Sequence, residues 1–167
     1  MGLVPRFAFF AAGVGAHKDR LQAFDTALLA AGKFAHNLVT VSSILPAKCE
    51  IIAAEEGFAM LEEGEITFCV MAREDTDIKG RYASASVGVV KVKKRGVIGY
   101  LSEYHGDARG NAETAFEAKR MAIEMFQTKM GVELAEDDLE RLEGATASIR
   151  NDGGGWVSAV ALCVFVL

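Results

Sequence analysis

Ser42 and Ser43 stand side by side where an apolar segment runs into a proline, in the stretch Asn37-Leu-Val-Thr-Val-Ser-Ser-Ile-Leu-Pro46. The hydroxyl of the second serine can attack the carbonyl carbon of the first, which converts the amide into an ester. Elimination from that ester cuts the chain, and hydrolysis of the new N-terminal residue leaves a pyruvoyl group. This ketone can accept electrons from a carbanion, so the pair predicts a proenzyme that is cut between Ser42 and Ser43 and makes its own cofactor.

A serine pair also has an ordinary structural interpretation, because serines are common at strand ends and in turns. The surrounding sequence favours the chemical one. The stretch Asn37–Pro46 resembles the self-cleavage segment of the pyruvoyl-dependent arginine decarboxylases. Upstream, Leu21–Gly32 resembles the first helix of that family, and downstream, Gly99–Gly106 resembles the strand end with its catalytic glutamate. Order, spacing and length fit as well, so the resemblance covers nearly the whole chain.

The resemblance implies that L-arginine is decarboxylated to agmatine and CO2. Loss of CO2 leaves a carbanion at Cα that no ordinary side chain stabilises, so an electron sink is required. A carbonyl made from Ser43 would form a Schiff base with the substrate amine and act as that sink. We therefore expect a covalent pyruvoyl cofactor, no pyridoxal phosphate and no metal, with a β chain of residues 1–42 and an α chain of residues 43–167.

Glu103 is the expected proton donor to Cα, by its place in the family pattern. Its neighbours are apolar, which raises a carboxyl pKa and keeps the group protonated near neutrality; they are Val97, Ile98, Tyr100 and Leu101. The alternative is a surface glutamate at a strand end.

Asn37 occupies the position of the family's active-site asparagine, whose side-chain amide would polarise the Ser42 carbonyl for self-cleavage. An extended strand from Asn37 to Ser43 spans roughly 20 Å. A straight strand would therefore keep the two residues apart within one chain. Either Asn37 serves the Ser43 of a neighbouring subunit, which is the site we expect, or the strand bends. The alternative role for Asn37 is to cap the start of a strand.

Arginine recognition is expected from Asp25, which stands where the family has its guanidinium-binding aspartate. A carboxylate can accept the fork of donors on a guanidinium. By the same alignment Leu28 would form the aliphatic wall, and the backbone carbonyls of Phe34 and His36 would accept the remaining N–H groups. Phe34 is larger than the residue that archaeal members carry there, and a solvated helical carboxylate is the alternative for Asp25.

Two other functions fit the same residues. A pyruvoyl-dependent decarboxylase of another amino acid, such as histidine, also cleaves at a serine pair, and Asp25 is what favours arginine. A non-catalytic homologue would keep the fold as a trimeric binding protein.

Composition limits the function further. The 167 residues fit one domain, and 51% hydrophobic with 25% charged residues is typical of a globular protein. A net charge of -5 argues against a nucleic-acid partner. The cluster of Lys91, Lys93, Lys94 and Arg95 predicts a hairpin turn.

Cys49, Cys69 and Cys163 are far apart and lack metal-binding spacing, which predicts unpaired, buried thiols in a cytoplasmic protein. The apolar run Phe7–Ala16 is short for a signal peptide and contains two glycines. The run Trp156–Leu167 is too short to span a bilayer. We expect both to be buried strands, with no signal peptide and no membrane partner.

Helical periodicity marks His17–Ala31 and a segment from Asn111 to Gly131, with a short third helix expected at Asp137–Leu142. The segment Gly13–Lys18 is expected to be a turn into the first helix. Strands are expected at Arg6–Ala12, Leu38–Ser43, Glu50–Ala54, Ile66–Arg73, Tyr82–Val92, Val97–Tyr104, Thr146–Arg150 and Trp156–Val166. Several are apolar on both faces, which indicates a layered α+β fold. The resemblance adds a four-layer αββα sandwich and a homotrimer, with possible higher assembly and active sites between subunits.

Overall fold

Strands and helices alternate irregularly through residues 2–167, the part of the chain that this computed structural model describes. In chain order the elements are β1 Phe7–His17, α1 Arg20–Gly32, β2 Asn37–Thr40, β3 Ile44–Leu45, β4 Glu50–Ile51, α2 Ala54–Phe58, β5 Ile66–Thr76, β6 Tyr82–Val92, β7 Gly99–Gly106, α3 Asn111–Met130, the 3-10 helix Glu136–Asp138, β8 Leu139–Arg141, β9 Ala145–Arg150 and β10 Trp156–Val166.

The first sheet has the strand order β2-β5-β10-β1-β4. The two apolar end segments of the chain form its centre, because β1 and β10 pair antiparallel along their whole length, from Phe7 opposite Val166 to His17 opposite Trp156. The short strand β2 lies parallel to β5 at one edge. Both apolar runs are strands, as expected from the sequence.

The second sheet has the order β3-β7-β6-β8, and β9 also pairs with β6. Strands β6 and β7 form a hairpin whose connection holds Lys93, Lys94 and Arg95, with Gly96 at a φ of 78°. The predicted hairpin turn is confirmed for these three residues, whereas Lys91 lies within β6 and pairs with Glu140.

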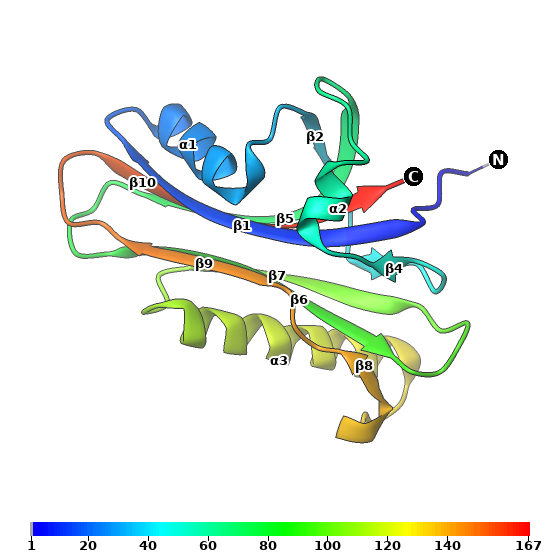
Figure 1. The fold of residues 1–167 in the computed structure, drawn as a ribbon. Coiled ribbons are helices and arrows are strands. Elements are labelled where there is room, and N and C mark those ends of the chain that lie inside the picture. Colours follow the sequence, from blue (N-terminus) through cyan, green and yellow to red (C-terminus); the bar gives the residue numbers. More distant parts are fainter. Residues whose placement is uncertain (1) are drawn as a thin grey trace.

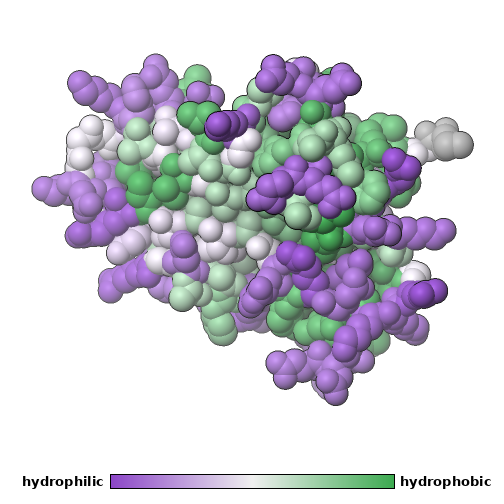
Figure 2. Space-filling view, viewed as in Figure 1, coloured by the Kyte–Doolittle hydropathy of each residue, from purple (hydrophilic) through white to green (hydrophobic). Residues whose placement is uncertain are grey.

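The two sheets face each other across an apolar core to which both contribute, including Val70, Ala161 and Phe165 from the first sheet and Val87 and Leu101 from the second. Helices α1 and α2 cover the outer face of the first sheet, and α3 lies along the outer face of the second (Figure 1). The protein is therefore a single domain of mixed helix and sheet, as predicted. In the same orientation, charged side chains rim the visible face around a central band of apolar and weakly polar atoms (Figure 2).

Gly13 and Gly15 let α1 lie directly on β1. A Cβ on Gly13 would be 2.3 Å from the Ala27 carbonyl oxygen, and one on Gly15 would be 2.2 Å from that of Ala23. Only glycine fits such a close approach of helix and strand. The expected turn at residues 13–18 is therefore wrong, because β1 continues to His17 beneath the helix.

Three other expectations differ from the structure. Residues 38–43 do not form one strand, because the chain leaves the first sheet after Thr40 and enters the second at Ile44. The expected helix at Asp137–Leu142 is a 3-10 turn followed by β8, whose Leu139 pairs with Val92 of β6. In addition, the strand expected at residues 50–54 stops at Ile51, and helix α2 follows. None of the helices within residues 2–167 is long and apolar enough to cross a bilayer.

Candidate active site

The serine pair lies where the chain crosses from one sheet to the other. The Val41 N–H still donates to the Cys69 carbonyl oxygen of β5, at an N···O distance of 2.9 Å. After a bend at Ser43, β3 pairs with the first residues of β7. Ser42 is exposed and Ser43 half-buried. The peptide bond between the two serines therefore lies outside both sheets. Its cleavage would leave β2 and β3 in their sheets.

The carbonyl groups on both sides of this bend are held by backbone donors. The Ile44 N–H donates to the Ser42 carbonyl oxygen at 3.1 Å, and the Leu101 N–H donates to the Ser43 carbonyl oxygen at 2.8 Å. The Ser42 carbonyl is the group that a Ser43 hydroxyl would attack. A donor aimed at this oxygen increases the electrophilicity of the carbonyl carbon.

Glu103 lies on the same edge as the serine pair. It is two residues beyond Leu101 on the same face of β7, which places its Cα about 7 Å along the strand from that of Leu101. Burial raises the pKa of the Glu103 carboxyl, and nearby His105 lowers it by a smaller amount. The net direction is upward, although Glu103 as a whole is exposed.

Asn37 is engaged away from the serines within its own chain. It begins β2, opposite Ile66, and its side-chain amide donates to the Gly64 carbonyl oxygen at 2.7 Å. The whole of β2 then separates it from the crossover. The structure does not bring Asn37 and Ser43 together.

The predicted arginine-binding residues lie on the outer side of the first sheet. Asp25 is exposed on α1, and Leu28 is half-buried one turn further on. After the helix, the Phe34 ring packs edge-on against Phe58, with ring centres 4.9 Å apart, and against His36 at 5.9 Å. Within residues 2–167, no hydrogen bond or ion pair joins these residues to Ser43 or Glu103.

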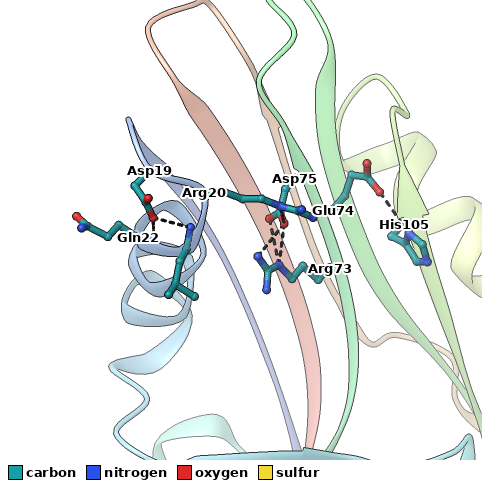
Figure 3. A network of polar contacts seen from close by, with 8 residues as sticks. Asp19, Arg20, Gln22, Arg73, Glu74, Asp75 and His105 are labelled. Carbon is teal, nitrogen blue, oxygen red and sulfur yellow. Dashed lines mark hydrogen bonds and ion pairs between the residues drawn. The ribbon is translucent and has the colours of Figure 1, made fainter.

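A charged network beneath α1 was not predicted from the sequence (Figure 3). Asp75 of β5 is buried and forms ion pairs with Arg73 of the same strand and Arg20 of α1. Glu74, between them, points to the other face and pairs with His105 of β7, with the nitrogen and oxygen 3.2 Å apart. The only sequence signal was the run of charges Arg73-Glu74-Asp75 at the end of an apolar strand.

All three cysteines are free and buried, as predicted. Burial raises the pKa of Cys49 to about 11 and that of Cys69 to about 12, which leaves both as unreactive thiols. Among residues 2–167, no cluster of three His, Cys, Asp or Glu side chains could hold a metal ion.

Comparison with known proteins identifies the class of enzyme. Residues 7–167 match the family described as "Pyruvoyl-dependent arginine decarboxylase (PvlArgDC)". The chain is 41% identical to pyruvoyl-dependent arginine decarboxylase 2 of Archaeoglobus fulgidus over the full length of both. It is 37% identical to pyruvoyl-dependent arginine decarboxylase 1 of Methanosarcina acetivorans, with 99% of this chain and 98% of the relative covered. A probable pyruvoyl-dependent arginine decarboxylase of Chlorobaculum tepidum is 38% identical, with 99% of each chain covered.

These similarities extend over the complete domain rather than over one motif. The enzyme class is therefore that of the pyruvoyl-dependent decarboxylases. The chain belongs to the pyruvoyl-dependent arginine decarboxylase family.

Proposed function

We propose that this protein decarboxylates L-arginine to agmatine and CO2 with a pyruvoyl group that it makes from Ser43. The observation that carries the proposal is the backbone at the sheet crossover. There the Ser42 carbonyl accepts the Ile44 N–H, and the Ser43 carbonyl is fixed to β7 two residues from Glu103. The names of the relatives support arginine as the substrate.

Self-cleavage begins with attack of the Ser43 hydroxyl oxygen on the Ser42 carbonyl carbon. The new C–O bond replaces the C–N bond, and the hydroxyl proton ends on the freed nitrogen. In the transition state the Ser42 oxygen gains negative charge, which the Ile44 N–H stabilises. Loss of the Ser43 Cα proton then expels the Ser42 carboxylate. Water finally releases ammonia from the dehydrated residue.

The residues around the bend fit the group that this sequence of steps would leave. In the uncut chain the Leu101 N–H donates to the Ser43 carbonyl oxygen, and the same hydrogen bond would hold the new group against β7. When present, the pyruvoyl group supplies an electron-accepting ketone for the substrate amine. Glu103 would donate the proton that replaces CO2 at the substrate Cα, and the upward direction of its pKa favours the protonated form that this role needs.

Arginine would be held by its guanidinium. Asp25 offers an exposed carboxylate on α1, and the carbonyls of Phe34 and His36 are the further acceptors in the proposal. Leu28 forms the aliphatic wall. Asp25 lies on α1, on the outer side of the first sheet, and Glu103 lies on β7 of the second sheet, so in this proposal the substrate bridges residues of two subunits.

A homotrimer is part of the same proposal. Asn37 would then act on the Ser42 carbonyl of a neighbouring subunit, since its own strand carries it away from the crossover. Exposed apolar side chains on and beside β2 support a covering partner: Val39 is 40% exposed, Val41 36% and Ile66 65%.

The layers of the fold, in the order helix, sheet, sheet and helix, support the expected four-layer αββα sandwich. The free cysteines support a cytoplasmic location.

Arginine turnover by the purified protein tests this proposal, with Ser43→Ala as the comparison. We expect CO2 and agmatine in equal amounts from the wild-type protein and neither from Ser43→Ala, which should stay uncut. Turnover of histidine instead of arginine would contradict the substrate assignment. An uncut wild-type protein without turnover would indicate the non-catalytic homologue.

A further inference from the structure

Asp75 is a buried carboxylate that ties α1 to the first sheet. Its side chain is 2% exposed and faces the helix from β5. An Arg73 nitrogen lies 2.7 Å from one carboxylate oxygen, and Arg20 Nε lies 3.0 Å from the same oxygen. Arg20 belongs to the first turn of α1, so the helix and the strand share one buried charge (Figure 3).

Such a group persists only where its partners compensate for the loss of water. Burial raises the pKa of Asp75, but hydrogen-bond donors on Arg73, Ser158 and Arg20, together with the charge of Arg73, outweigh this and hold the pKa below its usual value. Asp75 is therefore ionised, and its charge orients both guanidinium groups.

Arg73 also contacts the middle of α1, through its guanidinium group. Its guanidinium carbon lies 3.7 Å from the centre of the Phe24 ring, which is the distance of a stacked cation–π contact. Phe24 directly precedes Asp25 in α1. Arg20 and Phe24 are one helical turn apart, so the contacts of Asp75 reach the start of α1 directly and the turn that carries Asp25 through Arg73.

We propose that Asp75 is a positioning residue for substrate recognition, acting through Arg73 and Phe24 to fix the Asp25 carboxylate. This inference rests on the proposed function, in which Asp25 binds the guanidinium of arginine. The guanidinium lies far from the reacting Cα. Loss of its alignment weakens ground-state and transition-state binding alike, which raises KM and leaves kcat unchanged.

A purely structural role would give a different result. It would lower the stability and the amount of folded protein, and with them self-cleavage and apparent kcat, but the KM of the remaining enzyme would stay the same. The ratio of the KM effect to the kcat effect therefore separates positioning from stabilisation.

The experiment compares Asp75→Asn with the wild-type protein, and Arg120→Met serves as the matched control. Arg120 forms ion pairs with Glu117 and Glu124 on the outer surface of α3, on the opposite side of the protein from α1. For Asp75→Asn we expect normal self-cleavage, kcat within about twofold of wild type, and a KM for arginine raised about tenfold. Agmatine affinity, measured by calorimetry on the cleaved protein, should fall by the same factor. Arg120→Met should leave all four quantities unchanged.

Phe24→Leu is the second variant and keeps both ion pairs. It should raise the KM about threefold, through loss of the stack alone. If Asp75→Asn does not fold, Phe24→Leu alone tests the positioning role. A folded variant of either kind with wild-type KM and agmatine affinity would overturn the positioning role. Failure of the wild-type protein to cleave or to consume arginine would instead overturn the proposed function.

Discussion

The contact between α1 and β1 gives a prediction whose size follows from the structure. Alanine at position 15 would place its Cβ 2.2 Å from the Ala23 carbonyl oxygen and 2.5 Å from the Ala27 backbone nitrogen. Ordinary van der Waals contact begins at 3.4 Å, so α1 would have to retreat by about 1 Å. Both clashing atoms belong to the helix backbone, so no side chain can rotate away to relieve them.

Gly15→Ala should therefore lower the free energy of unfolding by about 2 kcal/mol, which is typical of an overpacked core. The thermal midpoint should fall by about 4–8 °C. Because the same helix carries Asp25, the KM for arginine should rise as well. Differential scanning calorimetry and steady-state kinetics measure the two effects.

Gly2→Ala is the control, because a Cβ there meets no atom within 4 Å. It should match the wild-type protein in both assays. An unchanged thermal midpoint for Gly15→Ala, or an equal loss in the control, would refute the close packing of helix on strand.

Further predictions concern the candidate site and its charged neighbour. Glu103→Gln should undergo normal self-cleavage. Its rate of arginine decarboxylation in single-turnover assays should be about 100-fold or more below that of the wild-type protein, as expected for loss of a general acid. In the wild-type protein, kcat should fall as the pH rises through the raised pKa of Glu103, because only the protonated carboxyl donates; a kcat constant through the pH range would contradict this role. Asp25→Asn should raise the KM for arginine while self-cleavage, followed by electrophoresis, proceeds at the wild-type rate. Ile44→Pro removes the donor to the Ser42 carbonyl and should slow self-cleavage about 100-fold, measured from the decay of the uncut band. Asp75→Asn should lower the free energy of unfolding, and this loss should be largest above the ordinary carboxyl pKa of about 4. The difference from the wild-type protein should shrink as the pH falls toward the lowered pKa of Asp75. Urea titrations across that pH range measure it.

Local patterns predicted the strands and helices that are long and apolar. The segments of β6 and β10 have the predicted bounds, because both are long and mostly apolar with few interrupting polar residues. The crossover at Ser42 and Ser43 was not predicted, since residues 38–43 read locally as one strand. Only pairing with β5 on one side and β7 on the other divides that segment between two sheets.

Contacts between distant segments explain the other differences. Gly13 and Gly15 suggest a turn when read alone, and only the presence of α1 above them explains glycine within a strand. Asp75 is ordinary in sequence, because its partner Arg20 is 55 residues away. For the candidate site, family resemblance named Ser43 and Glu103, and the structure places them along one edge. Asn37 lies at the start of β2 with its side chain hydrogen-bonded to Gly64, and this placement depends on pairing with β5, which no local pattern encodes.

The mass of the purified protein is the most direct test of the central claim, that Ser43 becomes a ketone. We predict two fragments, one of residues 1–42 with a free carboxylate at Ser42, and one of residues 43–167 that is lighter by one ammonia than the same peptide with an N-terminal serine. A single intact chain after prolonged incubation, or a larger fragment with the full mass of a serine N-terminus, would contradict the account.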